Sequence, residues 1–211
     1  MKNRKLVLST GNKNKVREIR EMLIHLPIEV LSKDDVNLGN IDVVEDGVTL
    51  RENSIKKAQA LSEYTDFMVM ADDSGLFVDA LNGDPGVYSN RYAGFEGNDM
   101  ANNVKLLDAL KDVEPSKRGA KFLTVITLVT EDKEVITING ELHGSIGFEL
   151  IGDKGFGYDP LFIPDGYDKT FAVLGKEVKN KISHRARALE EMKKILTNLL
   201  EDDIDENNSS K

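Results

Sequence analysis

Residues 67–76 read FMVMADDSGL, an apolar run that ends in two adjacent carboxylates, Asp72 and Asp73, followed by a Ser-Gly pair. The pattern predicts a buried strand that ends at the carboxylates and leads into a turn. Neighbouring acidic side chains repel each other when both are ionised, so keeping them together at neutral pH requires a metal ion, a cationic partner or exposure to water. Two interpretations therefore stand at this point: a divalent cation site and a solvated Asp-Ser-Gly turn.

A polar loop near the N-terminus is a candidate phosphate site. Residues 9–15, STGNKNK, lie between the strand-like residues 5–8 and a segment with apolar residues at helical spacing. The backbone N–H groups at the start of that helix, with Lys13 and Lys15 beside them, suit phosphate oxygens. The Gly-Lys-Ser/Thr ending of a P-loop is missing, so no P-loop mechanism is inferred. An ordinary strand-to-helix turn with solvated lysines is the alternative.

A glycine-aromatic segment is a candidate site for a flat ligand. Residues 155–162 read GFGYDPLF, in a chain with only 6% aromatic residues and no tryptophan. Glycines let the backbone approach a ligand, and a Phe face can stack on a nucleobase for about 1–3 kcal/mol. The alternative is a tight bend that enters a strand at residues 161–163, with the rings in the core.

A basic segment precedes the last helix-like stretch of the chain. Residues 179–185 read KNKISHR and lead into a segment with apolar residues at helical spacing. Ser183 is a suitable N-cap, which places His184 and Arg185 in the first turn of the helix. Because an arginine at a helix start opposes the macrodipole, this position favours a functional role over a structural one. A solvated basic stretch is the alternative.

Together these four segments resemble the family of noncanonical purine nucleoside triphosphate pyrophosphatases, also called inosine triphosphate pyrophosphatases or Ham1-like proteins. The resemblance runs from residue 6 to about residue 196 and includes residues 79–89, DALNGDPGVYS, and residues 91–94, RYAG. Each motif alone is weak, but their joint occurrence in this order is specific. Ser9 stands where alanine is common, and Asp84 stands where a small residue is common. Neither position is one to which the resemblance assigns chemistry.

The resemblance implies a reaction, a fold and an assembly. The reaction is hydrolysis of ITP, dITP or XTP between the α and β phosphates, which releases the monophosphate and pyrophosphate and cleans the nucleotide pool. The implied fold is α/β, with a long mixed β-sheet between two lobes, a cleft between the lobes, and pairing into a homodimer. The implied cofactor is Mg²⁺, with Mn²⁺ as a substitute.

The resemblance also assigns roles to residues of this sequence. Asp73 is expected to be the catalytic carboxylate and a metal ligand, and Glu45, in residues 43–47 (VVEDG), a second metal ligand. Whether Asp72 shares the metal stays open. The triphosphate is expected to be held by Thr10, Gly11, Asn12, Lys13, Asn14, Lys15, Lys57 and Ser74. The base is expected to be held by Phe156, Gly157, Tyr158, Asp159, Lys179, His184 and Arg185.

Base choice is expected to depend on Arg185, because a donor that faces a 6-oxo group accepts hypoxanthine and xanthine but meets the 6-amino group of adenine. The residue 10–15 loop is expected to lie far from Arg185. Phosphate affinity and base choice should then be separable.

The composition excludes several classes of protein. With 211 residues, a net charge of −9 and no cysteine, the chain suits one domain at residues 1–200 and an acidic, disordered tail at residues 201–211. Cysteine chemistry is excluded, and three scattered histidines argue against a His-rich zinc site. The acidic balance argues against a nucleic acid polymer as partner. No apolar run approaches a membrane span or signal peptide, so we expect a cytoplasmic protein without membrane contact.

The remaining segments predict alternating strands and helices. Residues 28–31, 121–129 and 134–138 are typical of strands, the last two joined as a hairpin, and residues 49–62 and 98–110 are typical of helices. A hairpin beside parallel strands predicts a mixed sheet.

Two other functions stay open from the sequence. A module that binds nucleotides without cleaving them would use the same loop and aromatic residue but would not need Glu45 and Asp73 together. A Maf-like pyrophosphatase acting on pyrimidine or modified nucleotides is the nearest enzymatic alternative.

Overall fold

The computed structural model describes residues 4–209, with side chains described as far as Glu201. Within this range a seven-stranded sheet has the order β2-β1-β3-β5-β6-β7, and β4 pairs with β3 off this path. The strands are β1 (Arg4–Leu8), β2 (Ile28–Ser32), β3 (Met68–Val78), β4 (Pro85–Gly86), β5 (Gly119–Val129), β6 (Val135–Ile146) and β7 (Phe162–Pro164). The α-helices are α1 (Lys13–Leu23), α2 (Leu50–Ser62), α3 (Asp99–Ala109), α4 (Phe171–Leu174), α5 (Lys176–Ile182) and α6 (His184–Ser209). Short 3₁₀ turns are η1 (Asp79–Leu81), η2 (Ser89–Arg91) and η3 (Pro115–Lys117).

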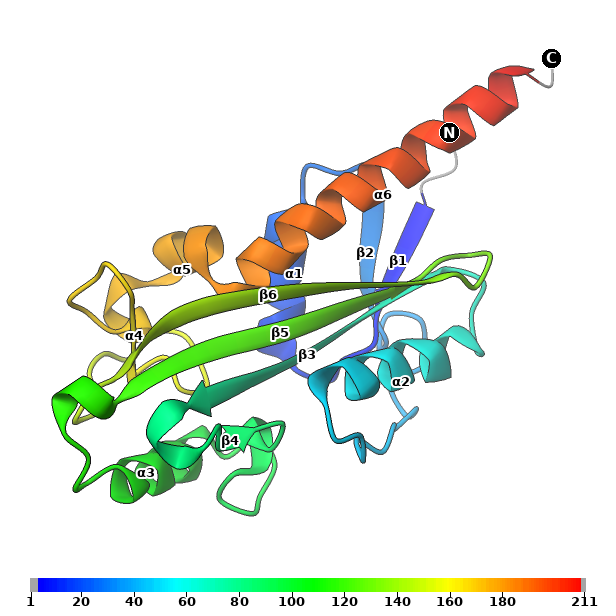
Figure 1. The fold of residues 1–211 in the computed structure, drawn as a ribbon. Helices are drawn as coiled ribbons and strands as arrows, with labels where there is room; N and C mark the ends of the chain where they lie inside the picture. The colour runs from blue at the N-terminus through cyan, green and yellow to red at the C-terminus, as the bar shows by residue number, and fades with distance from the viewer. Residues whose placement is uncertain (1–3, 210–211) are drawn as a thin grey trace.

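The sheet is mixed, so the predicted α/β class is confirmed. β1 pairs in parallel with β2 and β3, whereas β5 pairs antiparallel with β3 and β6. The hairpin between β5 and β6 closes where Thr130 N–H donates to the Glu134 carbonyl at 2.9 Å. The three long strands β3, β5 and β6 run side by side through the molecule (Figure 1).

The predicted end of the third strand was wrong. β3 does not stop at the carboxylates but continues through Asp72 and Asp73 to Val78. The reason is its neighbour: β5 pairs with β3 over the whole stretch from Val69 to Val78, so the backbone stays extended. Because successive side chains of a strand point to opposite faces, Asp72 and Asp73 lie on opposite sides of the sheet.

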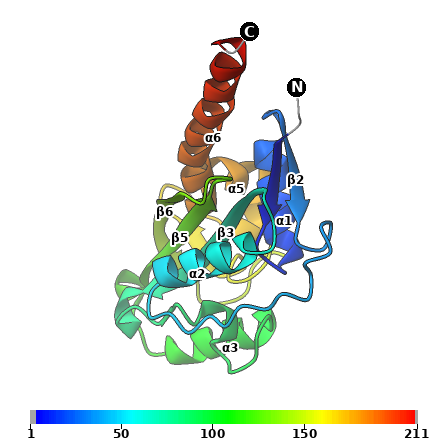
Figure 2. The same ribbon diagram turned by 90° about the vertical axis from the view of Figure 1, so that its right-hand side faces the viewer.

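Apolar cores form at both ends of the long strands. At one end, Met68 and Met70 pack in a core with α1 and α6, while Val69 and Ala71 pack against α2 on the other face. At the far end, Leu76 belongs to a separate core with α3, α4 and β7. These cores define two lobes, and Asp72, Asp73 and Ser74 lie between them on β3. Figure 2 shows the lobe around α3 below the helices α2 and α6.

Side-chain caps fix where three helices begin. Asn12 accepts hydrogen bonds from the backbone of Asn14 and Lys15 at the start of α1. Thr49 accepts one from Glu52 N–H before α2, and Ser183 accepts one from Ala186 N–H at 3.1 Å before α6. The predicted N-cap role of Ser183 is confirmed, as is the placement of His184 and Arg185 in the first turn.

The last helix is longer than the sequence pattern predicted. The apolar spacing predicted its end near Leu200, followed by a disordered tail at residues 201–211, but α6 continues to Ser209. No glycine or proline interrupts the chain between His184 and Ser209, so nothing in the sequence stops helix propagation there. Residues 210–211 lie outside the described part. Among the described helices, none is both long enough and apolar enough to cross a membrane.

Candidate active site

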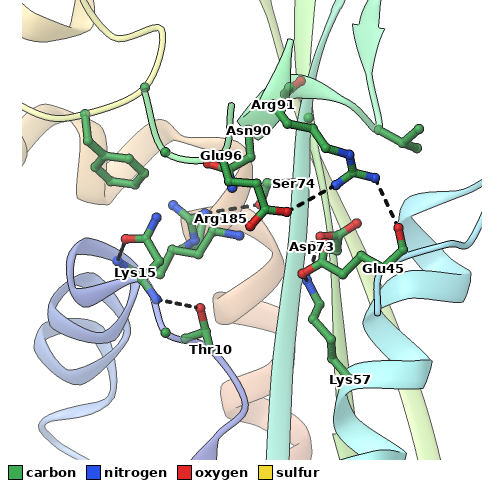
Figure 3. Close-up of a pocket in the computed structure, with 18 of the residues that line it drawn as sticks. Thr10, Lys15, Glu45, Lys57, Asp73, Ser74, Asn90, Arg91, Glu96 and Arg185 are labelled. Carbon is green, nitrogen blue, oxygen red and sulfur yellow. Dashed lines mark hydrogen bonds and ion pairs between the residues drawn. The ribbon is translucent and has the colours of Figure 1, made fainter. Parts of the chain in front are cut away.

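A cleft of about 460 Å³ opens beside the middle of β3 and takes residues from both lobes (Figure 3). It brings together most of the side chains that the sequence predicted for a site: Thr10, Gly11, Asn12, Lys15, Glu45, Lys57, Asp73, Ser74, Phe156, Gly157, Tyr158, Asp159, Lys179, His184 and Arg185. Lys13 and Asn14 are not among its lining residues. Lys13 is exposed, and the Asn14 side chain accepts a hydrogen bond from Arg17 at the surface.

Asp73 and Glu45 are joined by one lysine (Figure 3). Lys57, from α2, donates from Nζ to Asp73 Oδ1 at 2.6 Å and lies 3.2 Å from Glu45 Oε1. Burial raises the pKa of Asp73, although the nearby Lys57 and Lys15 charges oppose that shift. Burial would lower the pKa of Lys57, but Asp73 and Glu45 outweigh it and leave this pKa raised. The ammonium therefore stays charged and compensates two carboxylates that the chain holds in one place.

The same two carboxylates are cleft side chains that could serve as ligands of a magnesium ion. Among the described side chains, those of residues 4–201, no group of three or more His, Cys, Asp or Glu is arranged to hold a metal. Mg²⁺ in phosphate-transfer sites commonly uses one or two protein carboxylates, with substrate phosphates and waters completing its octahedral shell. Glu45 and Asp73 therefore suit a metal that arrives with a phosphate ligand rather than one held by the protein alone.

Asp72, on the opposite face of β3, is fully engaged by other residues. Arg185 Nε donates to its Oδ2 at 3.0 Å, Thr124 Oγ1 donates to the same oxygen at 2.8 Å, and Lys15 Nζ is paired with Oδ1. Burial opposes ionisation here, but the Arg185 and Lys15 charges outweigh it and hold the pKa of Asp72 well below its usual value. Asp72 is thus an ionised carboxylate that holds Arg185, Thr124 and Lys15 together. Asp73 is the carboxylate that faces the cleft between Lys57 and Glu45.

Arg185 is anchored by carboxylates and a hydroxyl. Besides Asp72, its guanidinium donates to Glu18 Oε2 at 2.6 Å and to Ser74 Oγ at 3.1 Å. Because Lys15 and Arg185 share Asp72, the phosphate loop is not distant from the basic helix start, and that expectation was wrong. The physical reason is that β1 and β3 are adjacent strands, so the loop after β1 lies beside the middle of β3.

The glycine-aromatic segment forms a supported loop at the other end of the cleft. Lys179 Nζ lies 4.1 Å from the Phe156 ring centroid, donates to Asp159 Oδ2 at 2.6 Å and is 3.2 Å from Glu18 Oε1. Gly155 has a positive φ of 83°, and a Cβ there would come 2.1 Å from Asp159 Oδ2. Glycine is therefore required for this carboxylate to close the loop.

Two residues of α3 hold the same loop, and Tyr158 of the loop packs in one core with this helix. Gly157 N–H donates to Asp99 Oδ2 at 2.7 Å, and Asn103 Nδ2 donates to the Gly157 carbonyl at 2.8 Å. Tyr158 behaves differently from Phe156: its ring is in the core, and its hydroxyl donates to the Ser89 carbonyl at 2.9 Å. The alternative expectation, a ring in the core, thus applies to Tyr158, while Phe156 is half-buried at the cleft.

His184 is a buried, neutral cleft residue. Its ring stacks on Phe122, with centroids 4.7 Å apart and an interplanar angle of 14°. Burial and the neighbouring Arg185 charge lower the pKa of His184 well below its usual value. In the described part of the chain its Nδ1 has no hydrogen-bond partner.

The model of the Ham1 family matches residues 6–195, which span the four motifs and every residue of the cleft. This chain belongs to the Ham1 family. It is 49% identical over 203 residues to the dITP/XTP pyrophosphatase of Clostridium perfringens, covering 93% of this chain and 99% of that protein. It is 48% identical over 195 residues to the dITP/XTP pyrophosphatase of Desulforamulus reducens, covering 92% and 96%. The solved structure of a HAM1 protein from Coxiella burnetii is similar with a TM-score of 0.83 at 38% identity, covering 92% of this chain and 99% of that one.

Several residues that line this Ham1 cleft or hold its side chains were missed by the sequence reasoning. Glu18 lies three residues after Lys15 on α1, so helical spacing could have placed both on one face. Thr124 is a polar residue inside an apolar strand, which is itself a signal of a buried hydrogen bond. Lys33 directly follows a strand that is parallel to β1, where ligands bind in open α/β sheets. For Glu96 and Asp99, no signal in the sequence was available.

Proposed function

We propose that this chain hydrolyses noncanonical purine nucleoside triphosphates, dITP, XTP and ITP, to the monophosphate and pyrophosphate. The observation that carries the proposal is the Asp73–Lys57–Glu45 arrangement, which lies in one cleft with the phosphate loop and the Phe156 loop. The naming of two close relatives as dITP/XTP pyrophosphatases supports the substrate class. A binding module would have no need for two carboxylates held together at this point.

The triphosphate is held by the loop after β1 in this proposal. Thr10 and Asn12 lie at the start of α1, where backbone N–H groups and the helix dipole favour anions. Lys15 supplies a positive charge from the first turn, and Ser74 supplies a hydroxyl from β3. The resemblance also assigned Lys13 and Asn14 to the triphosphate. Their positions outside the cleft do not support that assignment.

Glu45 and Asp73 would hold Mg²⁺, which when bound would offset phosphate charge and favour attack at the α phosphorus. Asp73 accepts a proton from the attacking water or orients that water. Lys57 places its ammonium beside both carboxylates, where it can stabilise negative charge that develops on the phosphate oxygens.

The base lies on Phe156 and is read by polar groups around it. Lys179 and Arg185 are donors that suit the 6-oxo group of hypoxanthine or xanthine, whereas adenine offers a 6-amino donor instead. A buried donor left unpaired by the wrong base can support discrimination of up to about 10⁴–10⁵. Asp159 fixes Lys179, and His184 lines the cleft beside Arg185.

We also propose that the protein acts in the cytoplasm as a homodimer. Exposed apolar side chains between residues 88 and 104 support a surface for self-association, because Tyr88, Phe95, Met100 and Val104 are each more than half exposed. Sedimentation analysis tests the assembly. A monomer at micromolar concentration would contradict it.

The deciding experiment is product analysis over a panel of nucleotides, with and without Mg²⁺. The proposal expects pyrophosphate and a monophosphate from dITP, XTP and ITP, with much slower reaction of ATP and GTP and none after chelation. Release of orthophosphate, or activity retained in excess chelator, would contradict the proposed mechanism. Preference for pyrimidine nucleotides would favour the Maf-like alternative. Tight binding without turnover would favour a binding module.

A further inference from the structure

A lysine that belongs to none of the four motifs lies beside the phosphate loop. β2 ends at Ser32, which is paired with Leu8 of the parallel strand β1, so Lys33 is next to the start of the loop at Ser9. Its side chain lines the cleft. Lys33 Cε is 4.0 Å from the position that a Cβ on Gly11 would occupy. Lys33 thus reaches the loop that is proposed to bind the triphosphate.

Lys33 differs from the other cations of the cleft in its partners. Lys15, Lys57, Lys179, Arg91 and Arg185 each lie within 4.0 Å of at least one carboxylate oxygen. Lys33 Nζ instead donates to a neutral acceptor, the Ile41 carbonyl, at 2.8 Å. Among the described lysines and arginines that line the cleft, Lys33 is therefore the one for which no ion pair within 4.0 Å is found. The Ile41 contact fixes the ammonium and leaves two N–H donors for a ligand.

The position of Lys33 in the fold indicates which part of a bound nucleoside triphosphate would lie nearest to it. Across the sheet the order β2-β1-β3 places Lys33 beyond the Thr10 loop, which in turn lies beside Asp73. The base-binding loop at Phe156 comes from the other lobe. With the base there and the reacting phosphorus beside Asp73, the group nearest Lys33 is the part of the triphosphate farthest from the base.

We propose that Lys33 binds the β and γ phosphates, which leave together as pyrophosphate. This inference rests on the proposed function for the polarity of the substrate, but not for the existence of an anion site. Lys33 would contribute to the affinity for triphosphate and for pyrophosphate, and not to the affinity for the monophosphate. Lys33 would then have the triphosphate-binding role that the sequence analysis assigned to Lys13. The Lys13 side chain is exposed outside the cleft.

The test measures binding without turnover. Isothermal titration in Mg²⁺ buffer would compare inorganic pyrophosphate, inorganic tripolyphosphate and IMP on the wild type, Lys33→Ala and Lys33→Arg. Lys194→Ala is the charge-matched control, because Lys194 is exposed on α6 and pairs with Glu191. Lys33→Ala should weaken pyrophosphate and tripolyphosphate by about 10- to 100-fold, the range for a hydrogen bond to a charged group. IMP affinity should not change, Lys33→Arg should retain most of the affinity, and Lys194→Ala should match the wild type.

Three outcomes would overturn the proposal: unchanged pyrophosphate affinity in Lys33→Ala, an equal loss for IMP, or no tripolyphosphate binding by the wild type. Circular dichroism melting of Lys33→Ala and Lys33→Arg checks that both variants are folded. Failure of the proposed function gives a different pattern. In that case the nucleotide panel shows no release of pyrophosphate, while the dependence of pyrophosphate binding on Lys33 persists.

Discussion

At the scale of single residues, Asp72 and Asp73 show how adjacent identical side chains acquire different chemistry. Strand alternation sends them to opposite faces of β3, and the two faces offer different partners. The positive charges of Arg185 and Lys15 lower the pKa of Asp72 and keep its carboxylate ionised. Burial instead raises the pKa of Asp73, which lies beside Lys57. The first is suited to holding the site together and the second to accepting a proton.

Asp73→Asn should lower kcat for dITP by about 10²- to 10⁴-fold, the usual contribution of a positioned acid or base, with a much smaller change in KM. The amide keeps the shape of the side chain but cannot act as a base. Steady-state kinetics on dITP measures both constants, and Asp108→Asn on the exposed surface of α3 is the control. Turnover close to that of the wild type would remove Asp73 from the reaction.

Asp72→Asn should instead lower the free energy of unfolding, by about 3–5 kcal/mol at pH 7, because it leaves Arg185 and Lys15 as buried cations without their carboxylate. Urea unfolding of both proteins measures the difference. A carboxylate with a depressed folded-state pKa stabilises above its unfolded pKa of about 3.9, and that stability is lost as the pH falls toward the folded value. The difference between wild type and variant should therefore be constant from pH 7 to about pH 5 and shrink below about pH 4. A difference that grows in acid would contradict this account.

At the scale of elements, α3 positions the aromatic loop. Asp99 and Asn103 lie one turn apart on α3 and bind the N–H and the carbonyl of the same residue, Gly157. The Phe156 ring is therefore placed by a helix of one lobe and by Asp159 within its own loop. Two independent supports at adjacent peptides leave the ring little freedom.

Asn103→Ala should raise KM for dITP several-fold while leaving kcat and the affinity for inorganic tripolyphosphate nearly unchanged. The reason is that the variant loosens the base platform and touches no phosphate contact. Kinetics on dITP and titration with tripolyphosphate separate these effects, and Asp108→Ala, on the exposed surface of the same helix, is the control. An equal loss for tripolyphosphate would show that α3 supports the whole cleft rather than the base end.

The sequence predicted the elements well and their contacts less well. Local signals such as Ser183 before an apolar helix or the hairpin near Glu134 depend on neighbours in the chain, so they can be read directly. The continuation of β3 past Asp73 depends on β5, about 50 residues later, and no local pattern contains it. The same holds for Glu18, which bridges Lys179 and Arg185 from the first helix.

At the scale of the whole molecule, the described structure has its cores at the two ends of shared strands, and α6 begins at the cleft and leaves the body of the protein toward its C-terminus (Figure 1). The last core residue contributed by α6 is Leu196, with Leu199 packed at its edge. The part of α6 beyond residue 200 is rich in acidic residues.

Deletion of residues 201–211 should leave the melting temperature within about 2 °C of the wild-type value and kcat/KM for dITP unchanged, because substitutions and deletions away from packed contacts have small effects. Thermal unfolding and kinetics of the truncated chain measure this. A truncation that also removes Leu196 and Leu199 is the comparison that should destabilise the protein. A large loss from the shorter deletion would show that the acidic segment packs on another surface.

Asp72 is the common partner of Arg185 and Lys15, which are proposed to hold the two ends of the nucleotide, and this has a thermodynamic consequence. A base that draws on Arg185 changes how much of the Asp72 charge is left to Lys15, so recognition at one end alters the other by a coupling free energy. Such coupling is reciprocal for binding equilibria. Inosine and inorganic tripolyphosphate, titrated separately and then together, should change each other's dissociation constant by the same factor, and Asp72→Asn should bring that factor to one. A purine that fits poorly at the base site would then also weaken the binding of its phosphates. The affinity of the enzyme for the two ends of the substrate would be coupled through one carboxylate.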